Sequence, residues 1–323
     1  MASEMNSRDL SQTYKMAGDM FVTLFNEIGK VIVGQADTVE QIAIAMLCNG
    51  HALIESNPGL GKTLTISTIS KAMDLNFSRI QCTPDLMPAD ITGTQIIEES
   101  GGHKEFKFEP GPIFANIVLA DEINRASPKT QSSLLEAMQE KQITVGNDTY
   151  ILEQPFFILA TQNPIEMEGT FPLPEAQLDR FLLKILVDYP SYEDEIEIVN
   201  RYTRSISPSV NKVVNKNTLL DLQRLTRDVP VADDIRNRAI KIVMSTRISS
   251  EFIEYGASPR ASIGIILAAK ARALIKGRNY VSAEDIDAMA YTVLRHRIVL
   301  TFEAERRGVS TDQVIKSILE KIK

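Results

Sequence analysis

Short apolar runs alternate with longer helical patterns between Phe21 and about Tyr189. Each run is compact and continuously apolar, which is typical of strands buried on both faces of a sheet. Because strands that alternate with helices form βαβ units, the pattern predicts an α/β fold in which helices cover both sides of a parallel sheet. The expected strands are residues 52–55, 77–81, 117–121, 156–161 and 181–187.

The pattern changes after Tyr189-Pro190-Ser191, where the β-like runs stop and long helical patterns continue to Lys323. Ser282 and Asp285 have the spacing of a capping box, which marks the start of one of these helices. We therefore expect a three-layer α/β domain over residues 1–189 and an all-helical domain over residues 190–323. The polar first dozen residues are expected to fray.

Two inserts, at about residues 93–108 and 142–152, interrupt the α/β domain. Each consists of two β-like runs around a short turn, Ser100-Gly101-Gly102 in the first insert and Gly146-Asn147-Asp148 in the second. This pattern predicts two β-hairpins. From the pattern alone, surface decoration and a functional role are equally good interpretations.

Composition narrows the classes of function. The formal net charge of −7 provides no basic surface for long phosphate backbones, so nucleic acid is not an expected partner. Cys48 and Cys82 lack the spacing of a metal site, and we expect two buried free thiols in a reducing compartment, the cytoplasm. No signal peptide or membrane span is expected, because no apolar stretch has the required length and flanks.

The clearest chemical motif follows the first expected strand. The run Ser56-Asn-Pro-Gly-Leu-Gly-Lys-Thr63 matches the pattern GxxxxGK[ST], except that Ser56 stands at the first glycine position. In such loops, backbone N–H groups and a helix N-terminus bind the phosphates of ATP, a lysine reaches the β and γ oxygens, and a hydroxyl holds Mg²⁺. Lys62 and Thr63 are expected in the last two roles. The residues expected to bind ATP or ADP here are Asn57, Pro58, Gly59, Leu60, Gly61, Lys62, Thr63 and Leu64.

Polar residues also end two later strands. Asp121 and Glu122 follow one apolar run, where Asp121 is expected to support Mg²⁺ and Glu122 to polarise the attacking water. Asn163 follows the next run, where its amide can orient a water molecule. Taken singly, the acidic pair is an ordinary solvated turn and Asn163-Pro164 an ordinary turn initiator. After a phosphate-binding loop, the functional interpretation is favoured for both.

These residues resemble the MoxR family of AAA+ ATPases, in order, from Val31 to about Ile322. Members of that family usually have glycine at the position of Ser56, and many have alanine at the position of Gly61. The motifs that carry the resemblance are Val31-Ile-Val-Gly-Gln35, Phe108-Glu-Pro-Gly-Pro-Ile-Phe114, Ala120-Asp-Glu-Ile-Asn-Arg-Ala126, Ala160-Thr-Gln-Asn-Pro164, Leu173-Pro-Glu-Ala-Gln-Leu-Asp-Arg-Phe181 and Gly256-Ala-Ser-Pro-Arg-Ala261.

The resemblance implies roles for five residues. Val33 and Gly34 would lie near the adenine, and Asn163 would be the sensor-1 residue. Arg260 would be the sensor-2 arginine of the helical lid, in contact with nucleotide, and Arg180 the arginine finger that acts on a neighbouring subunit. A guanidinium group presents a planar fork of donors that suits phosphate oxygens. Without the resemblance, surface salt bridges are the simpler interpretation of both arginines.

The resemblance also implies a function and partners. The expected protein is a ring-forming ATPase, a hexamer, that remodels or matures protein or metalloprotein clients together with a partner carrying a von Willebrand factor A domain. Both inserts would then point toward the central face of the ring. One alternative is a nucleic-acid motor of the helicase-like branch, which the acidic charge disfavours. Another is a nucleotide-gated scaffold without hydrolysis, for which Ser56 is the sole support.

Overall fold

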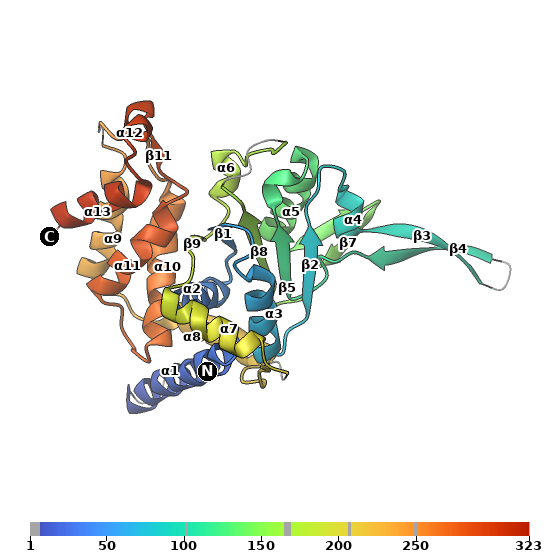
Figure 1. Ribbon diagram of the computed structural model, residues 1–323, viewed down its shortest axis with the longest axis horizontal. Coiled ribbons are helices and arrows are strands. Elements are labelled where there is room, and N and C mark those ends of the chain that lie inside the picture. Colours follow the sequence, from blue (N-terminus) through green and yellow to red (C-terminus); the bar gives the residue numbers. More distant parts are fainter. Residues whose placement is uncertain (1–6, 101–102, 165–168, 206–207, 249–250, 323) are drawn as a thin grey trace.

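The computed structural model describes residues 7–100, 103–164, 169–205, 208–248 and 251–322. At its centre lies a sheet of five strands in the order β2-β5-β8-β1-β9, in which every neighbouring pair is parallel (Figure 1). All five carboxyl ends therefore lie at one edge of the sheet, where α/β proteins bind ligands. The strands are β1 (Ala52–Ser56), β2 (Phe77–Gln81), β5 (Ile117–Asp121), β8 (Phe157–Gln162) and β9 (Leu183–Val187).

Helices cover both faces of this sheet, which confirms the predicted α/β class. Alternate strand residues enter two different hydrophobic cores, because successive side chains point to opposite faces. Ile54 and Leu119 pack in the core shared with α1 (Ser7–Gly29), α2 (Ala36–Leu47) and α3 (Lys62–Ala72). Their neighbours Leu53 and Val118 pack in the core beneath α5 (Pro128–Glu140). Short helices α4 (Pro88–Thr92), η1 (Ile123–Arg125) and α6 (Glu175–Leu178) complete this part of the chain.

The first helix extends further than the sequence indicates. The first dozen residues were expected to fray, but α1 begins at Ser7, whereas residues 1–6 lie outside the described chain. Tyr14, Phe21, Leu24 and Ile28 are buried at helical spacing along one side of α1, and this burial against the first core stabilises the helix.

A predominantly helical region follows the sheet, as expected. It begins with α7 (Tyr192–Tyr202), and we call the part from α8 to α13 the lid, which packs beside the edge strand β9 (Figure 1). The lid also contains a two-stranded antiparallel ladder that the sequence pattern did not predict, β10 (Ile253–Tyr255) with β11 (Val299–Leu300). Its helices are α8 (Lys216–Asp228), α9 (Asp233–Ser245), α10 (Pro259–Ile275), α11 (Ala283–Leu294), α12 (Phe302–Arg306) and α13 (Thr311–Lys321). No helix in the described ranges is long and apolar enough to cross a membrane.

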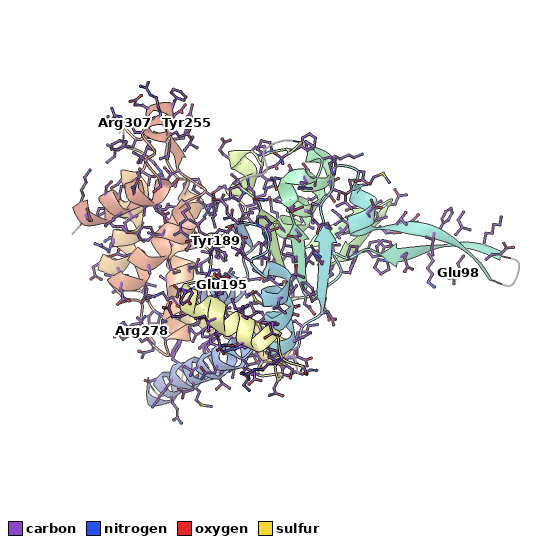
Figure 2. All side chains as sticks on the ribbon, viewed as in Figure 1. Glu98, Tyr189, Glu195, Tyr255, Arg278 and Arg307 are labelled. Carbon is purple, nitrogen blue, oxygen red and sulfur yellow. The ribbon has the colours of Figure 1, made fainter. Side chains whose placement is uncertain are left out.

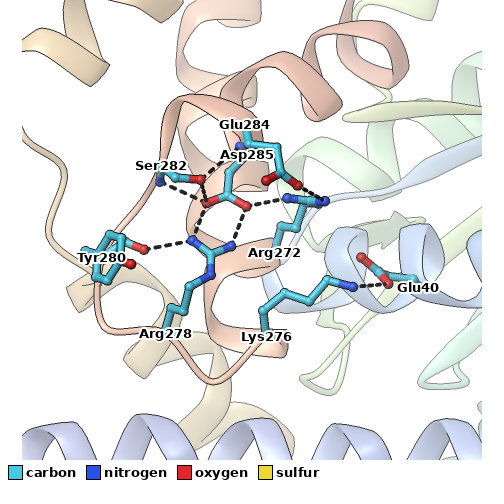
Figure 3. A network of polar contacts seen from close by, with 8 residues as sticks. All are labelled: Glu40, Arg272, Lys276, Arg278, Tyr280, Ser282, Glu284 and Asp285. Carbon is cyan, nitrogen blue, oxygen red and sulfur yellow. Dashed lines mark hydrogen bonds and ion pairs between the residues drawn. The ribbon is translucent and has the colours of Figure 1, made fainter.

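A buried carboxylate organises one end of the lid (Figure 3). Asp285 is fully buried and accepts hydrogen bonds from Arg272 at 2.5 Å and from Arg278 at 2.6 and 2.7 Å. Its other partner is Ser282, with which it forms the expected capping box at the start of α11. Burial alone would raise the pKa of Asp285, but the hydrogen bonds from Arg278, Ser282 and Arg272 hold it at about 2.

Two hairpins extend from the α/β part. β3 (Gly93–Ser100) pairs with β4 (His103–Pro110), and this hairpin projects far from the sheet (Figure 1), although residues 101–102 of its expected turn lie outside the described chain. β6 (Gln142–Val145) pairs with β7 (Asp148–Ile151) across Gly146, which has a φ angle of 64°. The rings of Phe108 and Tyr150 stack at 4.0 Å between centroids, so the two hairpins contact each other at their bases.

Candidate functional site

The loop between β1 and α3 has the backbone of a phosphate-binding loop. Gly59 and Gly61 take left-handed φ angles of 85° and 73°, which residues with side chains rarely adopt. Because α3 begins at Lys62, the N–H groups of its first turn lack helical partners and are available to an anion. The Lys62 ammonium group donates to the carbonyls of Ser56 and Asn57 at 3.4 Å each. Backbone donors and one cation are thus combined as phosphate binding requires.

Ser56, which departs from the glycine pattern, is the last residue of β1 and is buried. It is not among the described residues with a positive φ angle, so its backbone does not require glycine. The serine is therefore compatible with the loop.

An apolar cavity of about 150 Å³ lies beside this loop, and we call it the P-loop cavity. Val33 and Gly34, expected near the adenine, are among its lining residues. Ile198 and Tyr202 of α7 form another wall, which the sequence analysis missed because α7 shows only an amphipathic pattern and no motif. The remaining lining residues are Val31, Ile32, Gln35, Gly59, Leu60, Gly61, Leu64, Thr65, Asp188 and Pro190.

Gln35 fastens the segment before α2 to the loop. Its amide donates to the Leu60 carbonyl at 2.8 Å, and its Oε1 accepts from the Thr65 hydroxyl at 3.0 Å. The neighbouring Gly34 has a φ angle of 71°, and a Cβ there would lie 2.8 Å from the Asp194 carboxylate. The left-handed backbone and the close approach of the Asp194 side chain therefore both favour glycine at position 34.

Asp121 is held on both carboxylate oxygens at the end of β5. Its Oδ1 accepts from the Thr161 hydroxyl at 2.6 Å, and its Oδ2 accepts from the Arg79 guanidinium group at 2.6 Å. Both donors come from the neighbouring strands β8 and β2, so the sheet itself orients the carboxylate. Arg79 was not identified from the sequence, since its role depends on which strands are neighbours.

Glu122 lies next to it in an unusual backbone conformation. Its φ angle is 57°, and its N–H donates to the Thr161 hydroxyl at 2.9 Å. The Gln81 amide donates to its carboxylate at 3.1 Å, and Arg125 forms an ion pair with it at 3.3 Å. A non-glycine residue in the left-handed region is strained, and such residues cluster at functional sites.

The chemistry of these groups fits Mg²⁺. The Thr63 hydroxyl and the Asp121 carboxylate are hard oxygen ligands of the kind that Mg²⁺ prefers. Each carboxylate oxygen can accept more than one bond, so the contacts with Thr161 and Arg79 orient Asp121 without using up its capacity.

Asn163 is buried directly after β8, the strand that lies between β1 and β5. Gln162 pairs with Glu55, near the end of β1, so Asn163 lies at the same sheet edge as the loop and Glu122. The structure thus brings together the polar strand ends that the sequence analysis had selected.

The two expected arginines lie at a different place. Arg180 and Arg260 line a second cavity of about 210 Å³ together with Asp179, and neither is among the lining residues of the P-loop cavity. Arg180 is exposed, and the Arg260 guanidinium group lies 3.4 Å from the Asp179 carboxylate, as in a salt bridge. The structure therefore groups Arg260 with Arg180 and not with the loop of its own chain.

One buried histidine near this cavity has a structural role. His51 Nε2 donates to the Met138 carbonyl and its Nδ1 accepts from the Ile158 N–H, both at 3.0 Å. This pairing fits only the neutral ring, and burial lowers the pKa of His51 to about 4. Across the described ranges, no cluster of His, Cys, Asp and Glu forms a further metal site.

Comparisons with known proteins cover both parts of the chain. Residues 51–183 match the ATPase family associated with various cellular activities (AAA), and residues 245–318 match the AAA lid domain. Chaperone MoxR1 from Mycobacterium tuberculosis is 44% identical over 304 residues, which cover 92% of this chain and 80% of that protein. Protein MoxR from Paracoccus denitrificans is 30% identical over 303 residues, which cover 86% of this chain and 88% of that protein.

The structural comparison agrees. A crystal structure of a candidate ATPase from Cytophaga hutchinsonii is similar with a TM-score of 0.90 and 43% identity, covering 98% of this chain and 97% of that one. Since sequence and structure match over the sheet and the lid alike, the resemblance seen in the motifs is confirmed. This chain belongs to the MoxR family of AAA+ ATPases.

Proposed function

We propose that this ATPase hydrolyses ATP at a site shared between two copies of the chain. The observation that supports this proposal is the placement of Arg180 and Arg260, which are exposed together outside the P-loop cavity. From that position the two arginines would contact the γ-phosphate of a neighbouring molecule. Supplying a cation from the neighbour makes hydrolysis depend on assembly into a ring, which we propose to be a hexamer.

In this mechanism the residues of one chain hold and orient the reactants. Lys62 and the backbone N–H groups of the loop bind the phosphates, and Thr63 and Asp121 would hold Mg²⁺, which neutralises phosphate charge. Glu122, held by the Gln81 amide, accepts a proton from the water that attacks the γ-phosphorus. The bond from that phosphorus to the bridging oxygen breaks, and ADP and phosphate leave.

Asn163 and the arginines of the neighbour complete the proposed mechanism. Asn163 orients the attacking water from its place between the strand ends. Arg180 of the neighbour stabilises the negative charge that develops on the transferred group, with Arg260 beside it. Val33 and Gly34 contact the adenine in the P-loop cavity.

We propose a chaperone-like function that remodels protein or metalloprotein clients, as the name of the M. tuberculosis relative suggests. The β3–β4 hairpin supports this because it exposes Ile97 and Phe106 to solvent. Glu98 on this hairpin lies at the far end of the molecule from Tyr255 and Arg307 of the lid (Figure 2). A partner with a von Willebrand factor A domain belongs to the same proposal. The compatible geometry of Ser56 leaves a scaffold without hydrolysis unsupported.

A mixing experiment tests the shared site. Arg180→Ala retains Glu122 but supplies no finger, and Glu122→Gln supplies a finger but cannot hydrolyse its own ATP. Each variant alone should be inactive, whereas a 1:1 mixture assembled together should recover about a quarter of the wild-type rate, because about a quarter of randomly formed interfaces combine both intact groups. A mixture as inactive as its components would contradict a site completed by the neighbour.

A further inference from the structure

Arg180 lies in a short stretch that the lid binds both before and after this residue. We call residues 179–182 the finger segment. Arg297, which follows α11, is almost fully buried, with a side chain exposure of 4%. Its Nε donates to the Asp179 carboxylate at 2.7 Å, and its Nη2 and Nη1 donate to the carbonyls of Phe181 at 2.6 Å and Leu182 at 3.0 Å. One guanidinium group therefore binds the finger segment before and after Arg180.

Other lid residues bind the same segment. The Ser258 hydroxyl donates to the Asp179 carboxylate at 3.1 Å, and His296 Nε2 lies 2.9 Å from the Phe181 carbonyl. On the opposite side, the Leu182 N–H donates at 2.8 Å to the carbonyl of His51, the residue before β1. The expected strand at 181–187 begins only at Leu183, because the two preceding carbonyls bind the lid.

The chemistry at this point requires arginine. Burial lowers the pKa of Arg297, and the Asp179 carboxylate raises it, so the buried cation depends on that carboxylate. The planar fork donates to the Asp179 carboxylate and to the carbonyls of Asp179, Phe181, Leu182 and Val293, which takes five N–H groups, whereas a lysine ammonium group has three.

We propose that Arg297 is a positioning residue for the ATPase reaction: it fastens the finger segment to the lid and so sets where Arg180 reaches the neighbouring site. This inference rests on the proposed shared site. In this role Arg297 acts through the backbone on either side of Arg180 and not through contact with the nucleotide. A displacement of about 1 Å at a catalytic group can cost on the order of 100-fold in rate, so the fixed position matters for turnover.

The test is Arg297→Lys in the assembled protein. We expect a turnover number lower by roughly 10- to 100-fold, with unchanged affinity for a fluorescent ADP analogue and unchanged assembly in sedimentation. The decisive measurement is a 1:1 mixture with Glu122→Gln. Since Arg297→Lys damages only the finger that a subunit gives to its neighbour, the mixture should recover about a quarter of the wild-type rate.

Arg238→Lys is the matched control. Arg238 is another poorly exposed lid arginine, which binds the Asp287 carboxylate at 2.8 and 2.9 Å and the Ile322 carbonyl at 2.6 Å but does not contact the finger segment. Its replacement should leave turnover within about twofold of wild type. If Arg297→Lys does not assemble, Ser258→Ala removes the hydroxyl that binds Asp179 without leaving a buried charge. It should show a smaller loss, and its 1:1 mixture with Glu122→Gln should exceed half of that variant's own rate, because half of the remaining sites receive an intact finger.

Three results would overturn the inference. They are normal turnover of assembled Arg297→Lys, an equal loss in Arg238→Lys, and no recovery with Glu122→Gln while the mixture of Arg180→Ala with Glu122→Gln does recover. Failure of that last mixture as well would count against the shared site itself, so the two proposals fail in distinguishable ways.

Discussion

Two clusters of arginine and aspartate involve the lid and use the same groups for different purposes. Asp285 is bound by Arg272 and Arg278, which lie within 13 residues of it, and the cluster closes the lid upon itself (Figure 3). Asp179 is bound by Arg297, which lies 118 residues away in the chain, and this cluster joins the lid to the finger segment. The first cluster should therefore affect stability alone, whereas the second should affect the rate of hydrolysis as well.

The largest expected effect lies at the finger itself. Arg180→Ala should lower turnover by roughly 10³- to 10⁵-fold, the usual contribution of an arginine finger, because the developing phosphate charge loses its compensating cation. Nucleotide affinity should change little, since the proposed finger acts on the γ-phosphate bound by a neighbouring chain and not on the nucleotide bound by its own. Steady-state ATP hydrolysis and equilibrium binding of a fluorescent ADP analogue check both points. A normal rate at saturating ATP would remove Arg180 from the mechanism.

Substitution of Asp285 tests the stabilising role of the first cluster. Asp285→Asn leaves two arginines without their buried carboxylate, and it should lower the free energy of unfolding by about 3–5 kcal/mol. Turnover per folded molecule should stay near wild type, because the cluster does not contact the finger segment. Urea denaturation and hydrolysis on the same samples measure the two effects.

Asp179→Asn should differ in its effect on turnover. Its side chain is partly exposed, at 18%, but the substitution leaves the buried Arg297 without its carboxylate, so a loss of about 3 kcal/mol in the free energy of unfolding is expected here too. Turnover should fall by roughly 10- to 100-fold, because the finger segment loses its charged anchor to Arg297 and Arg260. If both substitutions changed only stability, the functional distinction between the clusters would be wrong.

The buried His51 and the carboxylate of Asp285 should affect stability in different pH ranges. The folded pKa of His51 is about 4, below the usual 6.5, so the unfolded chain binds a proton first and stability falls as the pH drops from about 6.5 to 4. The shift corresponds to a loss of about 3 kcal/mol, to which the depressed pKa of His296 adds. The depressed pKa of Asp285, about 2, matters only below about pH 4.

Urea midpoints between pH 7 and 4.5 measure this slope, and the control is His51→Gln, an uncharged hydrogen-bonding replacement. The variant should show a shallower decline than wild type. An unchanged slope would mean that His51 is not the residue responsible.

The smallest effect is expected at an exposed contact between the lid and α2. Lys276 forms an ion pair with Glu40 at 2.9 Å, and its side chain is 44% exposed. Exposed pairs contribute little, so Lys276→Ala should change the free energy of unfolding by less than about 1 kcal/mol and leave turnover unaltered. A large loss of turnover in this variant would show that lid contacts in general, and not the Asp179 cluster, control hydrolysis.

The sequence predicts those features that depend on residues close together in the chain. A phosphate-binding loop needs only its own spacing, and Asp121, Glu122 and Asn163 could be found because parallel strands place their ends at one edge. The partners of these groups could not be found in this way. Arg79 contacts Asp121 only because β2 and β5 are neighbours, and the sequence does not specify the strand order.

Contacts within the lid are still harder to predict from the sequence. Its helices follow from periodicity, but the β10–β11 ladder joins residues more than forty positions apart and leaves no local pattern. Arg260 and Arg297 cluster around Asp179 because the lid packs against the finger segment. No motif spacing encodes such a contact, although Arg260 lies in a motif and Arg297 does not.

Completion of the active site by a neighbouring molecule is tested most directly by ATP hydrolysis of the wild-type protein as a function of protein concentration. Mg²⁺ is present, and sedimentation is measured on the same samples. We predict that specific activity rises in step with the assembled fraction and is near zero for the monomer. Full specific activity in samples that sediment as monomer would contradict the account.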